Sequence, residues 1–168
     1  HGDWLGDHGL ILKGPMLYEG LLRVGMIVRG PGVKAGQVVE QPVSTLDLSP
    51  TFFELAGVAP QLTQHGQSLR ALLAGEDAPR DCARSEWELL PGRVGVGLSL
   101  RCVRTRDAKL TLELQSGAGE MYDLAADPHE MNNVFEAPAY AGLRERLTAL
   151  IHARPDDAGP LRIAVGSA

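Results

Sequence analysis

The first thirteen residues hold most of the side chains of this chain that could do chemistry. They include His1, His8, Asp3, Asp7 and Lys13, together with three glycines. Carboxylate and imidazole groups are ligands for divalent metals, and glycine lets backbone and ligands approach closely. A lysine supplies a positive charge for an anionic substrate. The segment therefore predicts a site for a metal ion and an anion.

Composition limits the classes of protein that these residues can serve. The 168 residues are 44% apolar and 22% charged, which is typical of one globular domain with a substantial core. The net charge is -5 without a Lys/Arg-rich run, so we expect no nucleic-acid partner. Gly, Arg or Pro interrupts every apolar run, so we expect no contact with a membrane through a spanning helix. The compartment, cytoplasm or periplasm, is left open.

Apolar periodicity predicts the elements that position the site. The run Val24–Val28 is typical of a strand buried on both faces. The charged segment 76–84 is typical of an exposed connection. Helical spacing marks 46–56 and 68–74, and alternation marks strands at 94–106, 109–115 and 120–124, with a hairpin turn at 116–119. A last helix begins at Pro138, carries the stripe Leu143, Leu147, Leu150 and Ile151, and ends near Pro155.

A series of short motifs runs along the chain in one order. They are His1-Gly2-Asp3-x-Leu5-Gly6-Asp7-His8-Gly9-Leu10-x-x-Lys13, Tyr18-Glu19, Arg23-Val24, Arg29-Gly30-Pro31-Gly32, Val43-Ser44-x-Leu46-Asp47-Leu48-x-Pro50-Thr51, Leu55-Ala56-Gly57, Gly66-x-Ser68-Leu69, Leu72-Leu73-x-Gly75, Val103-Arg104-Thr105, Lys109-Leu110 and Met121-Tyr122-Asp123-Leu124-x-x-Asp127-Pro128-x-Glu130-x-x-Asn133. Together they resemble the second half of a type I sulfatase, a member of the alkaline phosphatase superfamily.

The resemblance implies an α/β fold of the alkaline phosphatase-like sulfatase type, present here as its C-terminal portion. Residues 1–80 would be the last part of the large catalytic α/β domain. Residues 81–155 would form a small antiparallel four-stranded subdomain with a C-terminal helix, and 156–168 a tail.

The resemblance also implies an activity, the metal-assisted hydrolysis of small-molecule sulfate monoesters. The nucleophile, a formylglycine made in a Cys/Ser-x-Pro-x-Arg motif, would lie outside this chain. His1 matches a ligand of a divalent metal, calcium or alternatively manganese, whose other ligands are absent here. Lys13 matches the catalytic lysine that contacts the sulfate. His8 is either a substrate contact or a loop histidine bonded to backbone, and the aspartates of this loop stabilise turns.

Three other strings resemble sites, and each has a simpler interpretation. Cys102 and Arg106 have the spacing of the nucleophile motif, but the central proline is missing, so we expect a buried structural thiol. Asp127–Glu130 resembles a metal-binding string, but a turn followed by a capped helix start is the preferred interpretation. We expect Asp47 to cap or brace a helix.

Alternatives remain for function and assembly. A phosphonate or phosphodiester hydrolase of the same superfamily fits the Gly6–Leu10 motif, and a folded fragment without catalytic activity is the non-enzymatic alternative. The isolated chain is expected to be inactive and not to hold the metal alone. Because the Val24–Val28 strand would lack its neighbours, a homodimer through exposed sheet edges is also expected.

Overall fold

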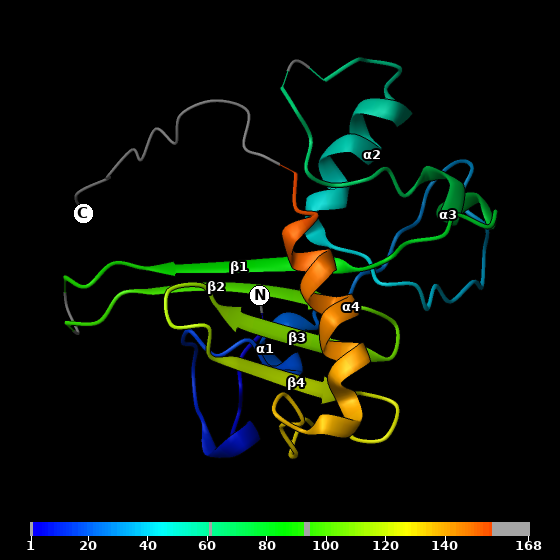
Figure 1. Cartoon of the computed structure of the whole chain (residues 1–168). Coiled ribbons are helices and arrows are strands. Elements are labelled where there is room, and N and C mark those ends of the chain that lie inside the picture. The colour runs from blue at the N-terminus through cyan, green and yellow to red at the C-terminus, as the bar shows by residue number, and fades with distance from the viewer. Residues whose placement is uncertain (1, 61, 93–94, 156–168) are drawn as a thin grey trace.

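A four-stranded antiparallel sheet forms the centre of the described structure. The computed structural model describes residues 2–60, 62–92 and 95–155, so His1 and the predicted tail lie outside the described residues. The strands β1 (Ala83–Leu89), β2 (Leu98–Arg104), β3 (Ala108–Glu113) and β4 (Gly119–Asp123) are neighbours in chain order. Helix α4 (Ala141–His152) lies across one face, and the N-terminal segment with α1 (Glu19–Leu22) covers the other (Figure 1).

The face under α4 carries the larger apolar core. Val103 of β2 is paired with Leu110 of β3, which is paired with Met121 of β4, so the three side chains point to the same face. Leu147 and Ile151 of α4 pack on this row, and Leu143 and Leu150 lie partly buried beside it. The predicted helix and its apolar stripe are confirmed, as is the small antiparallel sheet.

The opposite face of the sheet is covered by residues from the start of the chain. Leu17 packs against Leu100 and Cys102 of β2, with Leu22 and Trp87 partly buried around them. Because successive strand residues point to opposite faces, these side chains alternate with those under α4. The sheet is therefore a shared wall between α4 and the segment that carries the candidate site residues.

Helices α2 (Leu48–Leu55) and α3 (Arg70–Ala74) lie close to the predicted positions, and both are tied to one buried carboxylate. Asp47 accepts hydrogen bonds from the backbone amides of Ser44 (2.7 Å) and Gln67 (2.8 Å). Arg80 pairs with the same carboxylate at 2.5 Å. The expected role of Asp47 as a brace is confirmed, because its carboxylate connects residues 44, 67 and 80.

Two expectations about strands are wrong. Val24–Val28 belongs to no strand in the described structure, and Ile27 is 97% exposed, because no described neighbour covers it. Conversely, the predicted exposed connection 76–84 ends inside β1, which the sequence pattern did not reveal. On the side that faces α4, β1 carries charged residues, and Glu86 pairs with Arg101 and Arg154. The strand therefore lacks the alternation of apolar and polar residues by which the other strands were predicted.

Other expectations lie outside what can be compared here. Residue 94, the predicted start of the second strand, is among those not described, and the boundary predicted near residue 80 stays a prediction. In the described part of the chain, no helix is both long and apolar enough to cross a membrane.

Replacing Leu147 tests the packing of α4 on the sheet. Leu147 is 0% exposed, so Leu147→Ala leaves a cavity and should lower the free energy of unfolding by about 2–5 kcal/mol. Leu90→Ala is the matched control, since Leu90 is 70% exposed and should change stability by about 0.5 kcal/mol or less. Urea denaturation followed by circular dichroism measures both; equal losses would show that α4 does not pack as described.

Candidate active site

The segment that carries the predicted site residues folds back on itself as a tight loop. The amide of Trp4 donates to the carbonyl of Leu12 (3.1 Å), and that of Gly6 donates to Leu10 (2.8 Å). A 3₁₀ turn, η1 (Asp7–Gly9), forms its tip. Asp3 accepts from the amide of Leu5 (3.0 Å), an arrangement typical of a turn-stabilising aspartate. The loop thus brings its two ends, near residues 2 and 13, together.

Lys13 lies at the closed end of this loop. Its Nζ donates to the carbonyl oxygen of Gly2 at 2.8 Å and lies 3.9 Å from Asp3 Oδ2. Gly2 follows His1 in the sequence, so the ammonium group of Lys13 contacts the peptide next to the predicted metal ligand. His1 itself lies outside the described residues. The lysine side chain is 42% exposed and therefore accessible to an anion.

Gly2 is fixed on α1 as well. Its amide donates to the carbonyl of Leu21 at 2.9 Å. A Cβ at this position would lie 2.3 Å from the carbonyl oxygen of Gly20, so only glycine permits the approach. Helix α1 therefore determines where Gly2, and with it the acceptor of Lys13, is placed.

His8 points away from the loop's closed end and into the sheet side of the molecule. Its Nε2 forms a 3.0 Å hydrogen bond with the carbonyl oxygen of Glu130. Its ring stacks on Tyr18 with centroids 3.8 Å apart and planes 4° from parallel, and Asp7 Oδ1 lies 3.3 Å from Nδ1. Only 13% of the side chain is exposed. This geometry has the features of a loop histidine bonded to backbone; a contact between His8 and substrate stays a prediction.

A buried ion pair that sequence reasoning missed lies beneath the loop. The side chains of Lys109 and Glu130, each 1% exposed, contact one another directly. Lys109 Nζ also donates to the carbonyl of Leu17 (2.7 Å), and Glu130 Oε2 accepts from the amide of Glu19 (2.7 Å). We call these two residues the Lys109–Glu130 pair. It joins β3, the segment after β4 and the residues at the start of α1.

The expectation for Asp127–Glu130 is correct only in part. A turn forms, and Asp127 accepts from the amide of Asn132 at 2.8 Å. No helix begins there, because Glu130 has a left-handed backbone with φ 57° and its carboxylate is used by Lys109. Nothing local in the sequence marks this residue as buried and charged.

Two tyrosines and a glutamate extend the same face of the sheet. The hydroxyl of Tyr18 donates to Glu120 at 3.4 Å, and the Tyr18 and Tyr122 ring centroids lie 6.3 Å apart. Burial raises the pKa of Glu120 and of both tyrosines above their ordinary values. Lys109 has two carboxylates within ion-pair distance, Glu130 in direct contact and Glu19 at 3.9 Å.

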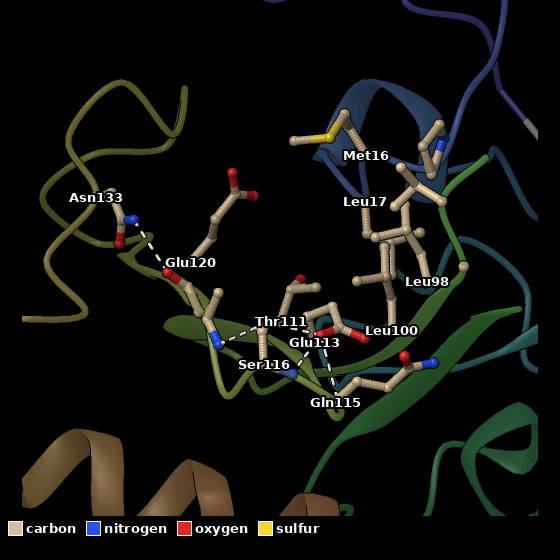
Figure 2. A pocket seen from close by; sticks show the side chains of 15 residues that line it. Met16, Leu17, Leu98, Leu100, Thr111, Glu113, Gln115, Ser116, Glu120 and Asn133 are labelled. Carbon is tan, nitrogen blue, oxygen red and sulfur yellow. Dashed lines mark hydrogen bonds between the residues drawn. The ribbon is translucent and has the colours of Figure 1, made fainter. Parts of the chain in front are cut away.

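Beside these residues lies a groove of about 720 Å³ (Figure 2). Met16, Leu17, Leu98 and Leu100 form its apolar side, and Glu120 stands across from them near Asn133. Neither Lys13 nor His8 lines it, so the groove is separate from the predicted anion contact. Among the described residues, no group of three or more His, Cys, Asp or Glu side chains could hold a metal ion. The described residues therefore do not fit a metal site by themselves.

Comparison with known proteins identifies the family. The sequence profile of N-sulphoglucosamine sulphohydrolase, C-terminal, matches residues 6–156. The chain belongs to the sulfatase family. A Delta 4,5-hexuronate-2-O-sulfatase of Bacteroides thetaiotaomicron is 32% identical over 164 residues, covering 90% of this chain and 32% of that protein. An N-acetylglucosamine-6-O-sulfatase of the same organism is 33% identical over 156 residues, covering 89% and 28%. The sulfatase chain thus spans less than a third of these relatives.

Solved structures confirm the expected fold class. A 2-O GAG sulfatase superposes with a TM-score of 0.76 at 31% identity, covering 90% of this chain and 34% of that one. A protein solved with its substrate, D-glucosamine-2-N,6-O-disulfate, gives 0.73 at 32% identity, with 90% and 31% covered. The phosphonate monoester hydrolase of Agrobacterium radiobacter gives 0.71 at 25%, with 92% and 34% covered. The higher identities favour a sulfatase over a phosphonate hydrolase.

The sulfatase motifs offer a signal that could have located the buried pair. Tyr18-Glu19, Lys109, Tyr122 and Glu130 all belong to the quoted motifs, and the structure gathers them on one face of the sheet. Separated by up to 112 positions in sequence, they share no local pattern. The available clue was that all of these residues belong to the sulfatase motifs although the resemblance assigned none of them a role.

Cys102 of this sulfatase chain is a buried thiol, as expected. It packs against Leu17 and Leu100, and burial raises its pKa to about 11. A neutral thiol inside a core is neither a nucleophile nor a metal ligand. Its resemblance to the nucleophile motif is therefore only a matter of spacing.

Alkylation of the two cysteines checks this placement. Iodoacetamide at pH 8 should label the half-buried Cys82 first and should label Cys102 only after urea unfolds the chain. Peptide mass spectrometry reads both sites, and a Cys82→Ser variant isolates the second. Equal labelling rates in the folded chain would contradict the buried position of Cys102.

Proposed function

We propose that this chain is the C-terminal part of a longer sulfatase that hydrolyses sulfate monoesters. Membership of the family and the similarity to sulfatases over 90% of the chain support it. The formylglycine nucleophile and most metal ligands would come from residues outside these 168. The chain would supply the anion contact Lys13 and one ligand of a divalent metal, His1.

One observation carries this proposal more than any other. Lys13 and Gly2 are eleven positions apart, yet the lysine ammonium donates to the Gly2 carbonyl at 2.8 Å. The loop therefore places the predicted anion contact beside the residue that follows the predicted metal ligand. Sulfate transfer needs positive charge close to the metal and the bound sulfate, because negative charge develops on the sulfate oxygens and on the leaving oxygen.

Calcium is the proposed metal, with manganese as the alternative. Metal bound with His1 would neutralise the sulfate oxygens, and oxygen and imidazole ligands suit either ion. The described residues hold no complete ligand set, so we propose that the isolated chain neither holds the metal nor turns over substrate.

A sulfated sugar is the proposed substrate class. Two relatives carry names of sugar sulfatases, and a structural neighbour was solved with a glucosamine disulfate. Hydrolysis of a phosphonate monoester is the second candidate, favoured by the neighbour from Agrobacterium radiobacter. Paired assays on an aryl sulfate and an aryl phosphonate of the same phenol separate the two.

Replacing Lys13 tests the proposed activity directly. In the longer protein, Lys13→Met should lower kcat for an aryl sulfate by roughly 10²–10³-fold, because the positive charge that stabilises the developing anion is lost. Lys34→Met is the matched control, since Lys34 lies near α3 and not in the loop. The isolated 168-residue chain should show no turnover with or without added calcium or manganese. Turnover by that chain, or full activity of Lys13→Met, would contradict the proposal.

Self-association of the isolated chain is a separate proposal. The side chains of Ile27, Val38 and Phe52 are 97%, 84% and 64% exposed, and exposed apolar side chains of this kind support a homodimer. We expect light scattering after gel filtration to give twice the chain mass, and Ile27→Lys to shift the equilibrium toward the monomer. A monodisperse monomer at all concentrations would argue against a dimer.

A further inference from the structure

We propose that Glu130, held by Lys109, is a positioning residue for Lys13, acting through the loop at residues 2–22. The inference rests on the proposed function of Lys13 and extends it to residues with no part in the predicted site. Glu130 uses its carboxylate on one half of the loop and its backbone carbonyl on the other. No other described residue bonds both halves from the sheet side in this way.

The first attachment is to the start of α1. Glu130 Oε2 accepts from the amide of Glu19 at 2.7 Å, while Lys109 donates to the carbonyl of Leu17 at 2.7 Å. The two charges therefore satisfy a backbone donor and a backbone acceptor on either side of Tyr18. Charge-assisted hydrogen bonds of this kind are short and strongly directional, so the entry of the chain into α1 is fixed relative to β3.

The second attachment is to the tip of the loop. The Glu130 carbonyl bonds to His8 Nε2 at 3.0 Å, and the His8 ring stacks on Tyr18. His8 and Glu130 both have left-handed backbones, with φ of 50° and 57°. Non-glycine residues seldom adopt this conformation unless their surroundings hold them in it. The mutual bond of two such residues indicates that the tip is held rather than free.

From these two points the connection to Lys13 is continuous. Helix α1 presents the Leu21 carbonyl to the Gly2 amide at 2.9 Å, and the Gly2 carbonyl accepts from Lys13 at 2.8 Å. A Cβ on Gly20 would lie 2.8 Å from Asp7 Oδ2, so α1 and the loop tip pack closely together at this point. A shift of α1 on the sheet would therefore move the acceptor of Lys13.

The first experiment measures hydrogen exchange in the 168-residue chain. Glu130→Gln keeps the shape of the side chain but removes the negative charge in direct contact with Lys109, so that the carboxylate of Glu19, 3.9 Å away, is the one that remains. Exchange in peptides from residues 2–22 should accelerate by roughly tenfold or more relative to peptides from β3. Leu147→Ala is the matched control, because it weakens the opposite face of the sheet and should accelerate both regions alike. Unchanged exchange in residues 2–22, or the uniform pattern of the control, would overturn the proposal.

A second variant keeps the test decisive if Glu130→Gln does not fold. His8→Phe retains a ring to stack on Tyr18 and removes the bond to the Glu130 carbonyl, together with the contact between Nδ1 and the neighbouring Asp7. Faster exchange confined to residues 4–14, with residues 17–22 unchanged, is the expected result. An unchanged pattern at the tip would overturn the second attachment and with it the proposal.

Kinetics of the longer sulfatase separate this inference from the proposed function. Glu130→Gln should lower kcat for an aryl sulfate by roughly 10²-fold with little change in KM, because Lys13 moves away from the sulfate while other substrate contacts remain. Faster loop exchange with an unchanged kcat would overturn the positioning role. Absence of sulfatase activity in the unmodified protein would instead overturn the proposed function, and exchange would still decide whether Glu130 holds the loop.

Discussion

The arrangement of the N-terminal half depends on a charge buried where the sheet meets the loop. Lys109 and Glu130 are both almost completely inaccessible to water, and each alone would be very unfavourable in that position. Removing one partner of a buried pair costs about 3–5 kcal/mol, because the remaining charge has no compensation. The chain can therefore bury Lys109 only when the segment around Glu130 and the residues before α1 have all come into place. A single ion pair makes three distant parts of the sequence fold together.

A second buried pair does the same for the middle of the chain. Asp47 and Arg80 form an ion pair in a region with little regular structure. The Asp47 carboxylate also binds the backbone just before α2, at Ser44, and just before α3, at Gln67. The sheet and α4, by contrast, are held by an apolar core with long runs of paired backbone. The sheet and α4 thus depend mainly on apolar burial, whereas the segments packed around them are attached largely through the two buried ion pairs. Buried charges specify position closely, because a hydrogen-bonded carboxylate tolerates little displacement.

Sequence reasoning succeeded where periodicity reports on contacts within the described chain. Helix α4 and strands β2, β3 and β4 bury one face on neighbours inside it, and their patterns predicted them. It failed at Val24–Val28, whose apolar run implied covering neighbours that the described residues do not supply. It failed again at β1, where Glu86 faces arginines instead of a core. The Lys109–Glu130 pair could not be derived locally, since its partners are brought together only by the complete fold.

The difference between segments that are covered by described neighbours and segments that are not also bears on where the candidate site lies. Exposed large apolar side chains gather in the first half of the chain, at Leu5, Ile11, Leu12, Ile27, Val38 and Phe52 among others. Apolar surface of this extent is unfavourable unless another part of a protein covers it. The loop that carries Lys13 is thus fastened on its inner side by Glu130 and open on its outer side. In the proposed sulfatase a site built from two parts would need this division, because the fixed half would orient the lysine while the other half would supply the metal ligands and the nucleophile. The buried pair therefore does for Lys13 what an apolar core cannot, which is to set its position while leaving its charge accessible.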